Sequence, residues 1–177
     1  MITQGQHLLE VIDDDIKNGT FKIPNEINII DAYCFAELHD LHSIIIPKQI
    51  SHIDEAAFYF CSNLECVVFE SESCKFGVDV FSWCENLRDV VLPRNQQEIP
   101  TGMFKSCNHL QTIHIPDTVC EIESYAFAYC ERLQYLTIPD QVKEITSEQF
   151  HDSKYVSLTY HGKKYTYDDL EVYKRFT

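Results

Sequence analysis

The chain has 177 residues, of which 28 are acidic and 14 are lysine or arginine, so its formal net charge at pH 7 is −14. A chain this acidic is repelled by nucleic-acid phosphates and by anionic membrane surfaces, which argues against both as partners. No stretch approaches 18 consecutive apolar residues, so no membrane insertion is expected either.

Residues 1–22 precede the regular part of the sequence and are predicted to form an N-terminal cap. They begin without a basic start followed by an apolar run, so no signal peptide is evident. Four apolar residues between Leu8 and Ile12 predict a short element that covers the first repeat. The run is too short to distinguish a helix from a strand.

From Ile23 onwards the sequence repeats every 23 residues, without an insertion or a deletion. Six repeats, here called coils, occupy residues 23–160, and they begin at Ile23, Ile46, Phe69, Leu92, Ile115 and Ile138. The clearest marker is one phenylalanine per coil, at Phe35, Phe58, Phe81, Phe104, Phe127 and Phe150. A fixed period in the twenties is typical of a solenoid, in which each coil buries its apolar side against its neighbours.

Each coil is predicted to contain one short strand. An apolar pair two residues apart, such as Val67 and Phe69, places both side chains on one face of an extended chain. Proline follows the strand in five coils and marks its end, because proline has no N–H for a ladder. Stacked strands form a parallel sheet, and the rest of each coil is the crossover, for which we expect turns around a spine of stacked phenylalanines.

The repeat has a specific consensus. It is clearest in coil five, at Ile115, Pro116, Ile122, Ala126, Phe127, Cys130 and Leu133. This pattern resembles the Treponema-type, or BspA-like, leucine-rich repeat from residue 23 to about residue 160. The resemblance implies an α/β repeat solenoid, a right-handed coil stack with a parallel concave sheet and little helix on its convex side. It also implies a role in binding proteins, often at bacterial surfaces, and carries over no catalytic residue.

The repeat is irregular in its middle and at its end. Ser73 and Gln96 stand where other coils have isoleucine or valine, and Pro100 is an additional proline, so we expect a locally reshaped layer there. In coil six, Thr159 replaces the apolar strand residue and Leu158 indicates a slip of one position. Decay of this kind is what the capping of a solenoid requires.

Residues 161–177 are predicted to form a C-terminal cap. The run from residue 160 to residue 167 indicates a hairpin with a Gly-Lys turn, and residues 168–173 indicate a brief helical tail. The tyrosines of this region are interpreted as a shield over the last coil, with a carbohydrate platform as the alternative. They are Tyr160, Tyr165, Tyr167 and Tyr173.

The eight cysteines do not indicate a redox site or a zinc site. Four of them occupy one position in consecutive coils, at Cys61, Cys84, Cys107 and Cys130. Stacked side chains point the same way, which is poor disulfide geometry, so we expect buried, reduced and inert thiols. No Cys-x-x-Cys motif occurs, and His39 and His42 are interpreted as surface histidines. With no serine triad or phosphate loop either, we expect a non-enzyme without metal or cofactor.

Strand alternation predicts the functional surface. The residues between the inward-facing positions point out onto the concave sheet. They are Ile45, Val68, Val91, His114 and Tyr160 in one row, and Cys66, Asp89 and Tyr135 in the other. Contiguous exposed apolar surface tends to mark an interaction site, and tyrosines are frequent hot spots, so these eight residues are the candidate partner-binding site.

Two hypotheses of function follow. The first is a non-catalytic module that binds a protein partner through the concave face. The second is a structural or self-assembling spacer of a larger surface array, in which the chain forms homo-oligomers, and a carbohydrate-binding adhesin module is a further alternative. A complete chain would be cytoplasmic, whereas a trimmed member of a surface family would be secreted or lie at the cell surface.

Overall fold

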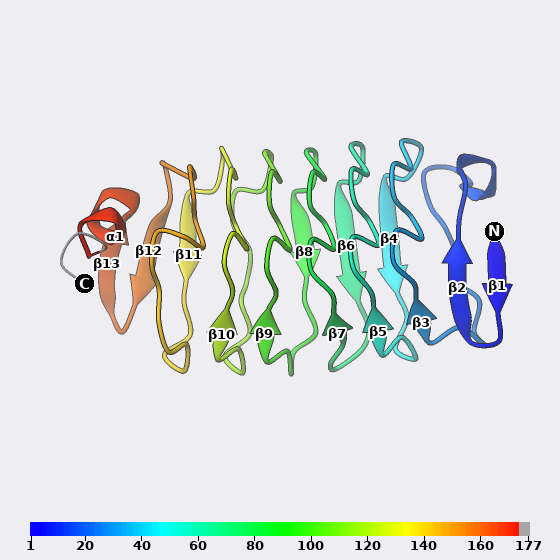
Figure 1. The fold of residues 1–177 in the computed structure, drawn as a ribbon, viewed down its shortest axis with the longest axis horizontal. Coiled ribbons are helices and arrows are strands. Elements are labelled where there is room, and N and C mark those ends of the chain that lie inside the picture. The colour runs from blue at the N-terminus through cyan, green and yellow to red at the C-terminus, as the bar shows by residue number, and fades with distance from the viewer. Residues whose placement is uncertain (174–177) are drawn as a thin grey trace.

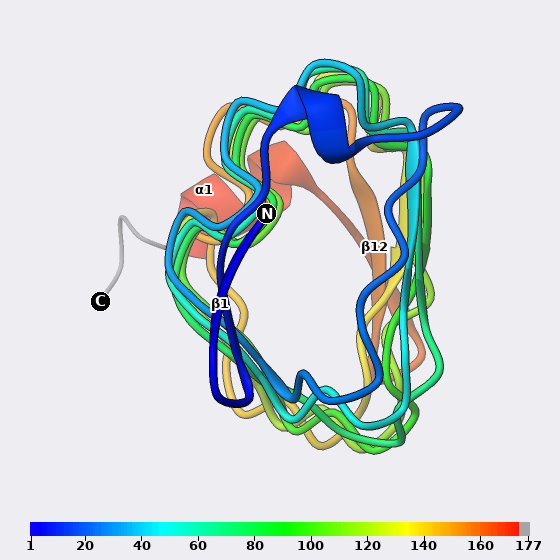
Figure 2. The ribbon, with the colours of Figure 1, turned by 90° about the vertical axis from the view of Figure 1, so that its right-hand side faces the viewer.

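In the computed structural model the coils stack along one axis, with the two termini at opposite ends (Figure 1). The structure describes the backbone of residues 1–173 and the side chains of residues 1–170. Seen along the axis, the coils superimpose into a ring with strands on two opposite sides (Figure 2). In Figure 2, which is seen from the N-terminal end, the chain goes up on the left and down on the right, so it turns clockwise as it moves away from the viewer and the solenoid is right-handed.

The predicted strand is present in five of the six coils. These long strands are β4 (Ser43–Ile46), β6 (Cys66–Phe69), β8 (Asp89–Val91), β11 (Tyr135–Thr137) and β12 (Ser157–Tyr160). Neighbours pair in parallel, β4 with β6, β6 with β8, and β11 with β12. Burial alternates as expected, since Ile44 and Ile46 lie in the core whereas Ile45 is exposed. In coil four the strand is reduced to one bridge between Thr112 and Tyr135.

A second strand on the opposite side of most coils is not predicted by the sequence. These short strands are β3 (Ile29–Ile30), β5 (His52–Ile53), β7 (Lys75–Phe76), β9 (Glu98–Ile99) and β10 (Glu121–Ile122). Each has two residues, one of them buried, so it contains no alternation from which a strand could be recognised. The expectation of turns alone in the crossover is therefore incomplete.

The near absence of helix is confirmed. Within residues 1–173 the helical elements are a 3-10 turn, Asp13–Asp15, and α1, Tyr167–Tyr173, both of them in the caps. Neither is long and apolar enough to span a bilayer.

The phenylalanine spine is confirmed as the centre of the core. All six rings of the repeat are fully buried. The centroids of consecutive rings lie 4.7–5.8 Å apart, with planes 7–22° from parallel. These separations are in the range of favourable ring pairs, so a stacked pair of phenylalanines joins each coil to the next in addition to the backbone bonds.

The cysteines that share one repeat position form a buried row beside this spine. The Cys61 thiol donates a hydrogen bond to the carbonyl oxygen of Phe35 in the preceding coil, at 2.9 Å. Cys84, Cys107 and Cys130 make the equivalent bonds at 3.1, 3.3 and 3.1 Å. All four thiols are free and buried, as predicted. In coil six, Ser153 takes this position, and its hydroxyl donates to the Phe127 carbonyl oxygen at 2.6 Å.

The N-terminal cap is built of strands. β1 (Ile2–Gln4) and β2 (His7–Glu10) form an antiparallel hairpin, and β2 continues in parallel with β3. Leu8 is fully buried against coil one, and Thr20 bridges to Ser43 at the start of β4. The open choice between helix and strand is therefore resolved in favour of strand, and most of the cap acts as an additional partial coil.

The C-terminal cap is the predicted hairpin and helix. β13 (Lys163–Thr166) pairs antiparallel with β12, and α1 follows with Leu170 buried. The turn is at His161 and Gly162, both with positive φ, one residue earlier than predicted. Tyr165 and Tyr167 pack partly buried against the core, as expected of a shield, whereas the side chain of Tyr173 lies outside the described residues. The division into caps 1–22 and 161–177 stays a prediction.

Pro100 interrupts the short-strand side of the solenoid. In the regular coils, Asp54 donates its main-chain N–H to the Ile30 carbonyl oxygen at 2.9 Å, and Gly77 donates to Ile53 at 2.8 Å. Pro100 has the equivalent repeat position and no N–H to donate. The short-strand sheet accordingly ends at β7 and starts again at β9, in the middle region where the sequence predicts an irregular layer.

The two polar residues of the irregular coils have different environments. Gln96 is buried, and its side-chain Nε2 donates to the Glu98 carbonyl oxygen at 3.0 Å while its Oε1 has no partner. Ser73 is exposed, and the next residue, Cys74, is buried instead. An unpaired buried amide oxygen costs stability, so Gln96 weakens coil four.

Candidate functional site

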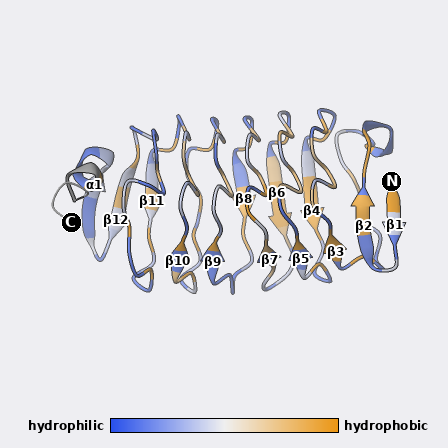
Figure 3. Cartoon of the chain, viewed as in Figure 1, coloured by the Kyte–Doolittle hydropathy of each residue, from blue (hydrophilic) through white to orange (hydrophobic). Residues whose placement is uncertain are grey.

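The long-strand face, defined as the outward side of β4, β6, β8, β11 and β12, carries the predicted apolar row. Ile45, Val68 and Val91 are paired residues of the adjacent strands β4, β6 and β8. Ile45 and Val91 are 57% and 55% exposed, and Val68 is half-buried. We call these three residues the apolar ribbon. Figure 3 shows the hydrophobic colouring of the long strands concentrated in β4 and β6.

The second predicted row lies beside the ribbon. Cys66 and Asp89 are paired across β6 and β8, and Tyr135 on β11 is 68% exposed. Partial burial, and then the charge of Asp89, raise the pKa of the Cys66 thiol. Raising this pKa keeps the thiol protonated, so Cys66 is a surface contact group and a poor nucleophile. His114 is also exposed, in coil four. Apart from Tyr160, the facing of both rows is as predicted, and their role in binding stays a prediction.

Tyr160 does not belong to this face. The one-residue slip at Leu158 is confirmed, because Leu158 rather than Thr159 is the partner of Leu136 in β11. A slip of one residue reverses the face on which each side chain of a strand lies. Tyr160 is therefore partly buried against the core, and its hydroxyl donates to the Val142 carbonyl oxygen at 2.5 Å. The predicted facing of Tyr160 is wrong.

A cleft separates β8 from the coil that follows it. β8 pairs with β6 alone, and Thr112 pairs with Tyr135 alone. Across residues 1–173, no backbone hydrogen bond joins β8 to Thr112–His114. The opening has a volume of about 480 Å³, and we call it the interstrand cleft. Its polar walls include Arg88, Asp89, His109, Thr112, His114 and Arg132.

Three cleft residues, Arg88, His109 and Arg132, are not predicted as site residues. They precede the strands of their coils, so strand alternation says nothing of their direction. The formal charge of coil four, +1 from Arg94, Lys105 and Glu98, gives no signal for them, because none of these three residues lines the cleft.

The turns between short and long strands carry exposed aromatic side chains, which the sequence pattern does not locate. They are Tyr33, Trp83, Tyr125, Tyr129 and Tyr155, with exposures between 38% and 77%. The first four have positive φ, a backbone state that recurs at the same turn positions of successive coils. These side chains lie at the edge of the stack and are separate from the long-strand face.

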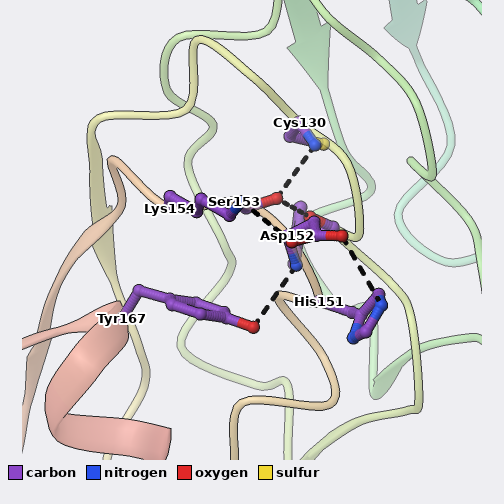
Figure 4. A network of polar contacts seen from close by, with 7 residues as sticks. Cys130, His151, Asp152, Ser153, Lys154 and Tyr167 are labelled. Carbon is purple, nitrogen blue, oxygen red and sulfur yellow. Dashed lines mark hydrogen bonds and ion pairs between the residues drawn. The ribbon is translucent and has the colours of Figure 1, made fainter.

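A polar network ties the last coil to the C-terminal cap (Figure 4). The Asp152 carboxylate lies 3.4 Å from the Lys154 Nζ, and the Asp152 main-chain N–H donates to the Tyr167 hydroxyl at 3.4 Å. The Ser153 Oγ accepts the main-chain N–H of Cys130 at 2.9 Å. Tyr167 is thus engaged by the coil it covers, which favours the role of a cap over that of a carbohydrate platform.

The described side chains, those of residues 1–170, do not form a metal site. Among them, no three His, Cys, Asp or Glu side chains converge as metal ligands. His39 Nδ1 lies 2.9 Å from the Ser62 Oγ, whereas His42 Nδ1 lies 2.9 Å from the Asp40 carbonyl oxygen. The two rings therefore have different partners.

Comparison with known proteins identifies the repeat. Residues 14–132 and 98–171 match the family model described as "BspA type Leucine rich repeat region (6 copies)". Among curated proteins, none matches the chain significantly.

Several solved structures have the same fold. A leucine-rich repeat protein from Treponema pallidum is 23% identical over 81% of this chain and 68% of its own, with a TM-score of 0.71. One from Bacteroides ovatus is 24% identical over 78% and 35%, with a TM-score of 0.68. A leucine rich cell surface protein from Faecalibacterium prausnitzii is 25% identical over 82% and 32%, with a TM-score of 0.57.

The chain thus spans about two thirds of the T. pallidum structure and about a third of the other two. These likenesses confirm the predicted leucine-rich repeat fold. Since the family model covers most of the sequence, the chain belongs to the BspA-type leucine-rich repeat family.

Proposed function

We propose that the chain is a non-catalytic protein-binding module, which contacts a macromolecular partner through the long-strand face with the apolar ribbon at the centre of the contact. The observation that carries this proposal is the exposure of Ile45 and Val91, at 57% and 55%, on β4 and β8, which belong to one sheet and are two strands whose other apolar residues are buried. Burying an aliphatic side chain completely contributes about 1.5–3 kcal/mol, so covering the ribbon would stabilise a complex.

The surroundings of the ribbon support the same proposal. Tyr135 is an exposed aromatic group on the same face, and tyrosine is frequent among interface hot spots. Leucine-rich repeat modules commonly act in protein interaction or at surfaces. The F. prausnitzii relative is described as a leucine rich cell surface protein, so a partner met at the cell surface is part of this proposal.

Replacing Val68 with aspartate is expected to abolish partner capture. Val68 lies in the middle of the ribbon, and a carboxylate there would be desolvated by any partner that covers Ile45 and Val91. The tagged chain and the variant would be compared in pull-downs from extracts and surface fractions of the source organism, with captured proteins identified by mass spectrometry. The melting temperature should stay nearly unchanged, because Val68 faces outward.

Val78→Asp is the matched control. Val78 is also an exposed valine, 38% accessible, but it follows β7 on the short-strand side. Loss of the same captured protein in both variants would contradict a contact centred on the ribbon. Unfolding of Val68→Asp alone would show that Val68 belongs to the core, in which case Ile45→Asp provides the same test at a more exposed position.

Self-association is the second candidate, and it rests on a different observation. All three residues of β1, the outermost strand of the N-terminal hairpin, are exposed, and Ile2 is 52% accessible. An unpaired strand edge can pair with a second chain. Sedimentation velocity over a hundredfold concentration range would distinguish the candidates, because a monomer throughout argues against assembly through β1.

A further inference from the structure

We infer that the interstrand cleft binds an extended acidic segment of the protein partner, with the partner's carboxylates held between Arg88 and Arg132. This inference rests on the proposed protein-binding function and adds the chemical class of the segment that is recognised. The cleft lies directly next to the apolar ribbon, because Val91 belongs to the ribbon and also lines the cleft. A segment that lies along the ribbon therefore enters the cleft.

The cationic character of the cleft is the first argument. The chain contains only four arginines, and two of them, Arg88 and Arg132, line this one opening. Both are exposed, and neither forms an ion pair with any residue of the described chain. Arg94, by contrast, is paired with Glu72. A planar guanidinium is suited to bidentate hydrogen bonding with a carboxylate.

The scarcity of acidic groups in the cleft is the second argument. Asp89 is the one acidic residue that lines it, so with neutral histidines the lining carries +1 in a chain of net charge −14. The overall charge favours a basic partner at long range. At 0.1 M salt, however, the field of exposed charges decays over about 10 Å, so the groups in the cleft decide what binds there.

The unpaired backbone is the third argument. Where the ladder is regular, the Arg88 main-chain N–H donates to the Glu65 carbonyl oxygen at 2.9 Å, and the Gln134 N–H donates to that of Gln111 at 3.0 Å. The equivalent bond from the Gln111 N–H to the Arg88 carbonyl oxygen is missing in the described structure. Peptide groups of an extended segment could satisfy main-chain donors and acceptors at these walls, as in other modes of strand recognition. An inorganic anion would leave the adjoining ribbon uncovered.

The histidines complete the walls without adding negative charge. His109 Nδ1 lies 2.9 Å from the carbonyl oxygen of Glu85, and the main-chain N–H of His109 donates to the same oxygen at 2.9 Å. This double contact holds the last part of coil four, just before its strand position, against coil three. His114, on the same coil-four wall, is exposed, so its ring is available to a bound segment.

The test uses three capped hexapeptides with alternating valine and a second residue: glutamate, glutamine or lysine. Each would be titrated into the 15N-labelled full chain and followed by NMR at the backbone amides and at the arginine Nε–H groups. The glutamate peptide is expected to shift Arg88, Arg132 and the amides of Asp89–Val91, and to bind at least about tenfold more tightly than the glutamine peptide. A tenfold ratio of dissociation constants corresponds to 1.4 kcal/mol.

The double variant R88Q/R132Q is expected to lose this difference between the peptides, whereas R94Q, whose arginine lies outside the cleft, should keep it. Equal affinity for the glutamate and glutamine peptides, stronger binding of the lysine peptide, or no binding of any peptide would overturn the inference. Inorganic phosphate is titrated in parallel. If phosphate alone shifts the same groups with equal affinity, the cleft takes free anions and the peptide assignment is wrong.

The two proposals fail separately. If Val68→Asp abolishes partner capture while R88Q/R132Q captures the same protein as the unmodified chain, the ribbon is the site and the acidic segment is ruled out. If the glutamate peptide binds as described but Val68→Asp leaves capture intact, the cleft recognises acidic peptides and the ribbon is not the centre of the contact.

Discussion

Phe81→Ala is expected to lower the free energy of unfolding by about 3–5 kcal/mol, the usual cost of deleting a buried aromatic ring. Phe81 is fully buried, and its ring is stacked between Phe58 at 5.2 Å and Phe104 at 5.8 Å. Its removal leaves a cavity and breaks two ring contacts in the middle of the spine. Urea unfolding followed by circular dichroism measures the change.

Phe60→Ala is the matched control for this prediction. Phe60 is the same residue type in the neighbouring coil, but it is half-buried in a turn at the edge of the stack. There the centroid of its ring lies 6.4 Å from that of Trp83. Its replacement should cost about 1 kcal/mol, the centre of the range for single substitutions. Equal losses in the two variants would show that the spine does not carry the stability assigned to it.

The chain is also expected to lose stability steeply between pH 9 and pH 12. Burial raises the pKa of the Cys34, Cys74 and Cys130 thiols from 9.0 to about 12, and raises the pKa of Cys84 and Cys107 well above 9.0. Above pH 9 these thiols ionise in the unfolded chain and stay protonated in the folded one. The unfolded state then binds fewer protons, so the free energy of unfolding falls as pH rises.

The loss of stability at alkaline pH is expected to be one of the largest effects in this protein. At pH 10, one unit above the unfolded value, each thiol with a folded pKa of about 12 lowers the free energy of unfolding by about 1.4 kcal/mol. Several such thiols act together against a total stability of only about 5–15 kcal/mol. Thermal unfolding under reducing conditions, repeated between pH 7 and pH 11, measures the decline.

Cys130→Ser separates thiol ionisation from other alkaline effects. Serine is tolerated at this repeat position, because Ser153 makes the equivalent hydrogen bond in coil six. The variant should gain about 1.4 kcal/mol relative to the unmodified chain between pH 7 and pH 10, since serine does not ionise there. Cys66→Ser, at a half-buried site, should gain less. An identical stability difference at pH 7 and at pH 10 would contradict the assignment to Cys130.

Much of the fold could be predicted because a solenoid repeats its core. The buried phenylalanines, the row of cysteines and the outward facing of Ile45 and Val91 all follow from one period and one alternation, and the structure confirms them. The short strands could not be predicted, because two residues such as His52–Ile53 contain no alternation. They pair through backbone hydrogen bonds between coils, and these bonds do not require particular side chains.

The candidate site was predicted less completely than the fold. The ribbon follows from alternation, but the cleft arises where a ladder is missing, and Arg88 and Arg132 meet there from coils three and five. Coil four lies between these coils along the chain, so no local window of sequence contains both arginines. Pro100 is a local signal of the break on the short-strand side only.

By itself the sequence determined the 23-residue period, the phenylalanine core and the side of each long strand that faces outward in the regular coils, since all three are local consequences of periodicity. The slip at Leu158 was visible in the sequence, but only the three-dimensional arrangement shows that it turns Tyr160 toward the core and that the interstrand cleft is open. Both depend on the register and spacing of one coil against the next. That register is set by backbone hydrogen bonds between coils, and these differ where the side-chain pattern stays nearly the same.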